Sequence, residues 1–248
     1  MVTIVRYDGR RIVLQTMLVC TSLYVLSAPQ TKPFRLLGVY HHELSHAALA
    51  LATDKGVMAV TVALPNEGGS FESTEPTGLI VGLAGYLGSM AVGCLWLVGS
   101  TRRMTGVIAA LVTFLASVGA CFLPLDHGAA TCAVLMVVLS AAVLLGAWLW
   151  SALGALLLRA VGTFLCLHAL FDFLSDARTR GSDIDQFAAA LGVPSAVCAV
   201  LYFGALLAFA AAATVRSVRG DLRPGPFYFR PSAFGSTIVE PKRLWVRK

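Results

Sequence analysis

The chain has 248 residues, of which 57% are apolar and only 13% are charged, and its mean hydropathy is +0.78. Soluble globular domains are about 45–50% apolar and about 25% charged. This composition therefore excludes an ordinary soluble domain and predicts a multi-pass integral membrane protein whose main solvent is the lipid bilayer. The net charge is +6, and eight of the 19 basic residues lie between Arg216 and Lys248. Such a tail suits anionic lipid headgroups or the cytosol, and without a folded basic domain we expect no nucleic-acid partner.

The apolar segments predict an all-α protein with about six or seven transmembrane helices. The candidate spans are 12–28, 34–53, 78–99, 106–122, 129–157, 160–175 and 193–215, with the fifth and sixth divided at Arg159. Seven spans would place the two termini on opposite sides of the membrane, and the excess of basic residues would place the C-terminus in the cytosol. We expect one integral-membrane domain over residues 1–215 and a basic, disordered tail over 216–248.

Residues 56–74 differ from the helical segments around them. Val57–Leu64 is rich in β-branched residues and predicts a strand, Pro65–Ser70 is typical of a turn, and Phe71–Ser73 can form a return strand. The segment therefore predicts a small β-hairpin that could cover a site or pair with an extended peptide. A polar connecting loop is the alternative. Further along the chain, residues 182–190 predict a short surface helix.

The most informative motif is H-E-x-x-H, formed by His42, Glu43 and His46 within the apolar span 34–53. Positions i and i+4 lie on one face of a helix, so the two histidines can bind one zinc ion together. Glu43 is placed to act as a general base toward water activated by that ion. Two interfacial histidines beside a surface glutamate are the alternative, but a buried glutamate among apolar residues is costly without a metal or a proton to transfer.

A hydrolytic zinc site needs a third protein ligand. Away from the first motif, only the predicted helix 160–176 and its end offer ionisable groups within an apolar span. These are His168, Asp172 and Asp176, spaced i, i+4 and i+8 on one helical face. We expect Asp172 to be the third ligand, with Asp176 the first alternative and His168 the second. His41 lies on another face of its helix, which favours a supporting or packing role.

These motifs together resemble the site-2 protease family of intramembrane zinc metallopeptidases, and most closely its small fungal and plant-type branch. The similarity begins with H-H-E-L-S-H-A at 41–47, followed by L-P-N-E-G-G at 64–69 and A-G-Y-L-G-S at 84–89. It continues with F-D-F-L-S-D at 171–176 and S-D-I-D-Q-F-A at 182–188. The chain departs from the L-D-G ligand motif of other branches, because Phe173 follows Asp172.

The resemblance implies a Zn²⁺-dependent protease that cleaves transmembrane protein substrates within the bilayer. Glu43 would be the general base, and the hairpin, through Asn66, Gly68 and Gly69, would bind the substrate as an added strand. Two other functions remain open at this stage. One is a zinc transporter or sensor that uses the same ligands without proteolysis, and the other is an inactive relative that binds membrane helices.

Overall fold

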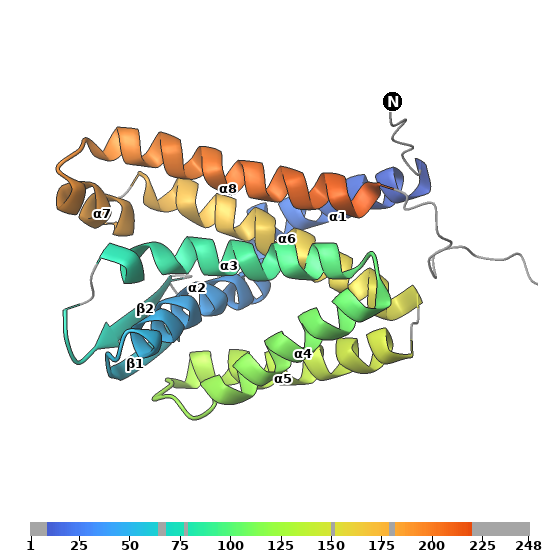
Figure 1. The fold of residues 1–248 in the computed structure, drawn as a ribbon, viewed down its shortest axis with the longest axis horizontal. Coiled ribbons are helices and arrows are strands. Elements are labelled where there is room, and N and C mark those ends of the chain that lie inside the picture. The colour runs from blue at the N-terminus through green and yellow to red at the C-terminus, as the bar shows by residue number, and fades with distance from the viewer. Residues whose placement is uncertain (1–8, 64–67, 77–78, 150–151, 179–181, 220–248) are drawn as a thin grey trace, which may run out of the picture.

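The computed structural model describes residues 9–63, 68–76, 79–149, 152–178 and 182–219. Within these residues the chain forms eight α-helices and one two-stranded antiparallel sheet (Figure 1). The elements are α1 (Gly9–Ser27), a 3₁₀ turn (Pro29–Thr31), α2 (Lys32–Ala52), β1 (Val57–Ala63), β2 (Gly68–Ser73), α3 (Leu79–Gly99), α4 (Arg103–Ala120), α5 (His127–Trp148), α6 (Ala152–Asp176), α7 (Asp183–Leu191) and α8 (Ser195–Val218). The predicted all-α membrane fold with a small hairpin after the zinc helix is confirmed.

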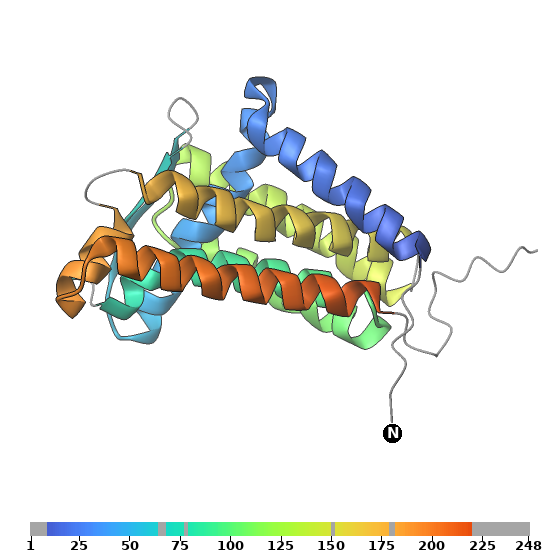
Figure 2. The ribbon, with the colours of Figure 1, turned by 90° about the horizontal axis from the view of Figure 1, so that it is seen from above.

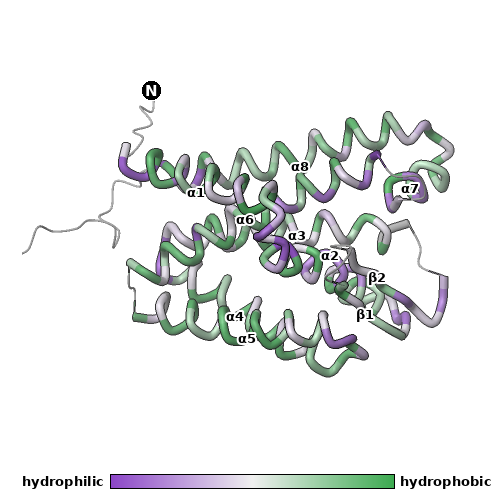
Figure 3. Tube along the Cα trace, turned by 180° about the vertical axis from the view of Figure 1, so that it is seen from behind, coloured by the Kyte–Doolittle hydropathy of each residue, from purple (hydrophilic) through white to green (hydrophobic). Residues whose placement is uncertain are grey.

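Five of the described helices, α3, α4, α5, α6 and α8, are long and apolar enough to cross a membrane. Figure 3 shows that α4, α5 and α8 are hydrophobic along most of their length. Helices α1 and α2 meet at an angle of 95° and make one further span only if they are counted together. The count of seven is therefore wrong. Pro29 and Pro33, which the sequence places between two apolar segments, mark the bend between α1 and α2.

This bend also changes the predicted arrangement of the termini. Figure 1 shows the start of α1 and the end of α8 at the same end of the bundle, and Arg11 Nη1 donates a hydrogen bond to the carbonyl oxygen of Arg219 at 3.2 Å. With α1 and α2 counted as one span, the described helices make six crossings, and this even number returns the chain to the side on which it began. The expectation of termini on opposite sides is thus corrected.

Helix α6 begins eight residues before the start at 160 that a division at Arg159 suggested. Helix α6 begins at Ala152, and Arg159 lies inside it, fully buried. Its Nη2 donates to the carbonyl oxygen of Ser217 at 2.8 Å, and its Nε lies 3.4 Å from Ser100 Oγ. The ends of the neighbouring helices α3 and α8 supply the oxygen acceptors that this buried guanidinium needs. Arg159 can therefore lie inside α6, and its charge does not mark the end of a helix.

Helix α3 is at the centre of the bundle and packs closely against α6. A Cβ added at Gly162 of α6 would lie 2.6 Å from the backbone nitrogen of Leu97 in α3, and one at Gly93 of α3 would lie 2.8 Å from the backbone nitrogen of Cys166. Glycine at the crossing lets the two backbones approach, as small residues do in membrane helix pairs. This contact fixes α6 beside α3, and α2 packs on another face of α3.

The hairpin lies beside the C-terminal end of α2 (Figure 2). Helix α2 ends where Asp54 takes a left-handed conformation with φ 58°, after which β1 pairs with β2 from Val57 opposite Ser73 to Ala63 opposite Gly68. On the other edge, β1 is bound by the loop before α5, since Val60 N donates to Pro124 O at 3.0 Å. Strand β1 is therefore internal, and β2 forms the outer edge.

Candidate metal centre

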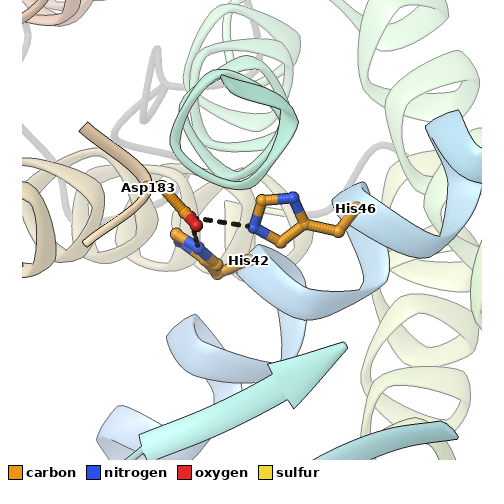
Figure 4. Close-up of side chains that lie close together, drawn as sticks. All are labelled: His42, His46 and Asp183. Atoms are coloured by element: carbon orange, nitrogen blue, oxygen red, sulfur yellow. Dashed lines mark ion pairs between the residues drawn. The ribbon is translucent and has the colours of Figure 1, made fainter. Parts of the chain in front are cut away.

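Helix α2 presents His42 and His46 to the interior of the bundle, and both side chains are buried. As the i, i+4 spacing predicts, the two imidazoles lie on one face of the helix, with ring centres 4.7 Å apart. The Nε2 atoms of both rings point toward the same carboxylate oxygen, which belongs to Asp183 (Figure 4).

Asp183 is the first residue of the short helix α7, which connects α6 to α8. Ser182 caps this helix, with its Oγ accepting from Asp185 N at 3.4 Å, and Gly192 ends it in a left-handed conformation. Ile184 and Ala188 are buried and anchor α7 against the bundle. Burial of the Asp183 carboxyl opposes its ionisation, but hydrogen bonds from His42 and His46 outweigh that effect and lower its pKa below the usual value.

The separations within this group suit a tetrahedral zinc ion. Asp183 Oδ2 lies 3.4 Å from His42 Nε2 and 3.3 Å from His46 Nε2, and ligand atoms of all three residues lie within 4.8 Å of one another. Ligands bound tetrahedrally at about 2.0–2.1 Å from one zinc ion are about 3.3–3.4 Å apart. Two imidazole nitrogens and one carboxylate oxygen are also a usual ligand set for a hydrolytic zinc site. The residues therefore fit the metal that the motif predicts.

The outer nitrogens of the two histidines face acceptors. His46 Nδ1 lies 2.6 Å from the carbonyl oxygen of Val81 in α3, and His42 Nδ1 lies 3.0 Å from Asp172 Oδ2 in α6. The second contact has the distance of an ion pair, although the ring N–H does not point straight at the oxygen. Acceptors at Nδ1 favour the tautomer that leaves Nε2 free to bind a metal.

The surroundings of His42 leave little space. A Cβ added at Gly85 of α3 would overlap the His42 ring, and the ring of Tyr86 packs edge-on against it with ring centres 4.5 Å apart. The Tyr86 hydroxyl donates to Asp176. Asp176, the alternative third ligand, thus contacts the tyrosine, and it is not among the described residues that group around the histidine pair.

The general base predicted from the motif, Glu43, is buried between α2 and the hairpin. A Cβ added at Gly69 of β2 would lie 2.6 Å from Glu43 Cγ and 2.7 Å from Glu43 Oε1. Phe71, two residues further along the same face of β2, stacks on His46 with ring centres 6.1 Å apart. The hairpin therefore covers the metal-binding helix directly, which a polar connecting loop would not require.

The remaining predicted residues lie around this centre. His168 is buried on α6, where its ring fills the space beside Gly38 of α2, one turn before His42. His41 is also buried and its Nδ1 lies 2.6 Å from the carbonyl oxygen of Leu37. Gly68 begins β2, whereas Asn66 lies outside the described residues.

Asp183 is the functional residue that the sequence prediction missed. Its segment belongs to the similarity over 182–188, but it lies outside the apolar spans, where the cost of burying a charge marks candidate ligands. The useful signal was an Asp directly after a capping Ser at the start of a short amphipathic helix, in a segment already similar to the family.

Comparison with known families agrees with this geometry. Residues 15–214 match the sequence model of the Peptidase M50B-like family, and since the match covers most of the chain, the protein belongs to that family. The predicted membership of the site-2 protease family is thereby confirmed, whereas the fungal and plant-type branch stays a prediction. No curated protein and no solved structure matches the chain. The family and the apolar helices make this a multi-pass integral membrane protein of a metallopeptidase family.

Proposed function

We propose that this protein is an intramembrane zinc metalloprotease that hydrolyses peptide bonds of transmembrane protein substrates, with His42, His46 and Asp183 as zinc ligands. The observation that supports this most directly is the convergence of two imidazole Nε2 atoms on one carboxylate oxygen at tetrahedral separations, within an apolar helix bundle. Membership of the Peptidase M50B-like family supports the same class of reaction.

A zinc ion bound here would lower the pKa of a water molecule and polarise the scissile carbonyl. Glu43 would accept the proton of that water on its carboxylate and donate it to the amine nitrogen of the leaving peptide. The position of Glu43, buried under Gly69 and next in sequence to one ligand, supports this role. The ring of Phe71 against His46 would help to exclude lipid and bulk water.

We further propose that Asp172 orients His42 and that Asp183 is the third ligand. Asp172 Oδ2 approaches Nδ1 of His42, which is the ring nitrogen turned away from Asp183. A carboxylate that accepts from the outer nitrogen of a metal-binding histidine fixes its tautomer and raises its basicity. Direct ligation by Asp172, as expected from the sequence, is the alternative that a matched pair of variants can test.

The substrate would bind in an extended form along the outer edge of β2. Among the described strands, β2 pairs with β1 only, while β1 is bound on both edges. A transmembrane helix must be locally unwound before hydrolysis, and an added strand satisfies the backbone groups that unwinding exposes. Gly68 and Gly69 lie at the start of this edge, and Gly69 is beside Glu43.

The test compares membranes that contain the wild-type protein with membranes that contain the Glu43→Gln variant. New peptide N-termini within transmembrane segments are mapped by mass spectrometry, and the zinc content of the purified proteins is measured. Loss of a general base lowers turnover about 10²–10⁴-fold, so we expect the new termini to disappear while bound zinc is retained. A zinc transporter or sensor needs ligands but no base, so unchanged peptide patterns in the two membranes would exclude proteolysis.

A further inference from the structure

The side of the bundle formed by α2 and α5 has a long apolar groove. Its outer part is a cavity of about 760 Å³ that begins at Val62 of β1 and follows α5 from His127 to Ala142. Its inner part, of about 350 Å³, lies between α1, α2, α5 and α6. Phe34 and Leu37 of α2 line both parts, so the two cavities adjoin. We call them together the α2–α5 groove.

The length and the openness of this groove suit another transmembrane helix. Between His127 and Ala142, helix α5 rises about 22 Å, which is roughly three-quarters of the apolar thickness of a bilayer. At the rim, Leu135 is 52% exposed and Val138 is 62% exposed, so the groove is open to the lipid along α5. Helices in a membrane associate by close packing of their side chains, and the groove offers an apolar surface for such packing.

His41 brings a buried polar group to the inner part of the groove. Its Nδ1 lies 2.6 Å from the carbonyl oxygen of Leu37. Because a carbonyl oxygen can only accept, Nδ1 carries the proton of the neutral ring and Nε2 is an acceptor. Among the residues that the structure describes, none donates a hydrogen bond to this Nε2. A buried acceptor is costly without a donor, so a molecule that fills the groove gains by supplying one.

The depth of His41 restricts what can supply that donor. Met136 and Leu139 line the same inner part of the groove, and both lie near the middle of the 22-residue helix α5. The acceptor is therefore at the level of the middle of a span, far from lipid headgroups and bulk water. Hydroxyl and amide side chains of transmembrane helices are the donors found at this depth.

The outer end of the groove leads to the metal centre. Val62, at this end, pairs with Gly69 in the hairpin, and Gly69 lies beside Glu43. Neighbouring strands are about 4.8 Å apart, so the groove ends one strand away from the position next to the general base. His41 also directly precedes the ligand His42. A helix in the groove would thus continue toward the hairpin.

We propose that the α2–α5 groove binds the part of a transmembrane substrate that stays helical, and that His41 Nε2 accepts a hydrogen bond from a hydroxyl or amide side chain near the middle of that helix. This inference rests on the proposed proteolytic function. It adds a preference among substrates, because a helix with a serine, threonine, asparagine or glutamine at this depth satisfies His41, whereas an entirely apolar helix does not.

The groove is tested by photo-crosslinking in liposomes with the full-length Glu43→Gln variant, which cannot cleave the probe. Benzoylphenylalanine replaces Val138 at the rim of the groove or, as a matched control, Val200 on α8, which is 72% exposed. The probe is a synthetic polyleucine transmembrane helix with asparagine or leucine at its centre. We expect much stronger crosslinking from position 138 than from position 200. Equal crosslinking from the two positions, as expected if lipid chains alone fill the groove, would overturn the proposal.

The role of His41 is tested by the concentration of probe that gives half-maximal crosslinking from position 138. Hydrogen bonds between membrane helices change association about three- to tenfold, so the asparagine helix should need that much less peptide than the leucine helix. Equal concentrations for the two helices would overturn the assignment to His41, whatever the behaviour of any His41 variant.

His41→Phe keeps a ring but removes the acceptor, and the zinc content of the purified variant shows whether the metal centre is intact. With zinc bound, this variant should crosslink both helices at the same concentration, and a surviving preference for asparagine would contradict the proposal. Cleavage is measured separately, from new peptide N-termini. A protein that cleaves without the preference contradicts this inference alone, whereas a protein that shows the preference without cleavage contradicts the proposed function.

Discussion

The two ends of the bundle bury charged or titratable groups in different ways. At the end of the bundle where α3 and α8 finish, Arg159 is fully buried, and its guanidinium contacts a backbone carbonyl and a hydroxyl at the ends of α8 and α3, where the helix dipoles are negative. At the metal-centre end, two imidazoles converge on one carboxylate oxygen, with Asp172 and Glu43 beside them. The first arrangement joins helices, whereas the second gathers donor atoms around a point that a cation can occupy. Substitutions at the metal-centre end should therefore lower zinc affinity, whereas substitutions around Arg159 should lower the free energy of unfolding.

The largest effect is expected from Asp183→Ala at the metal-centre end. Removal of a zinc ligand should reduce zinc affinity by more than the 10–100-fold that loss of an orienting partner costs, which is the effect expected of Asp172→Asn. Zinc titration of the purified variants measures both, with Asp185→Asn on the same helix as the control. If Asp172→Asn lowers zinc affinity more than Asp183→Ala does, direct ligation by Asp172 is the better assignment.

Arg159→Met should have the converse effect. Removal of the guanidinium leaves the Ser217 carbonyl and Ser100 hydroxyl without this donor, and the free energy of unfolding should fall by about 1–3 kcal/mol. Zinc affinity of the folded fraction should not change, because the substitution lies at the other end of α6. Unfolding and zinc binding are measured in the same detergent. A folded variant with weakened zinc binding would break the distinction between the two ends.

A matched pair of glycines tests how closely α3 supports the metal centre. Gly85→Ala introduces a Cβ that overlaps the His42 ring, whereas a Cβ at Gly82, one turn earlier, meets no atom within 4 Å. Overpacking of this kind costs about 1–3 kcal/mol, which should appear as weaker zinc binding by Gly85→Ala. Gly82→Ala should bind zinc like the wild-type protein. The same affinity in both variants would mean that His42 can move without loss of the site.

The smallest effect is expected at the cap of α7. Ser182→Ala removes the acceptor for Asp185 N and should destabilise the start of the helix by about 0.5–1 kcal/mol. Ser182→Gly should destabilise it by only a few tenths of a kcal/mol. Because Asp183 is the next residue, zinc affinity should fall a few-fold in the alanine variant and less in the glycine variant. Isothermal titration distinguishes them, and a larger loss for glycine would argue against a capping role.

The sequence was sufficient for features that depend on local spacing. The i, i+4 pair of histidines, the hairpin with its glycines and the short helix before α8 all follow from patterns within about ten residues, and the structure has each of them. The bend at Pro29 was not predictable, because two apolar segments of span length look the same whether they make one crossing or two. This error changed the predicted side of the N-terminus.

The choice between Asp172 and Asp183 depended on contacts across the whole chain. The cost of a carboxylate in an apolar span correctly marked Asp172 as a residue with a partner, and it lies beside His42. That cost does not distinguish a carboxylate that binds a metal from one that contacts a ligand histidine. Asp183, on a helix between spans, gave no such signal, and only the packing of α7 against α3 and α8 brings it to the histidines of α2.

The position of Asp183 in α7 also has a consequence for biosynthesis. It follows His42 by more than half the length of the chain, and α3, α4, α5 and α6 lie between them. At about 5–20 residues per second of synthesis, Asp183 emerges on the order of ten seconds after the histidines. With the proposed ligands, the nascent chain cannot complete its metal centre until these four helices have been made. With the proposed activity, the order in which the chain is translated would protect newly inserted helices nearby from premature cleavage.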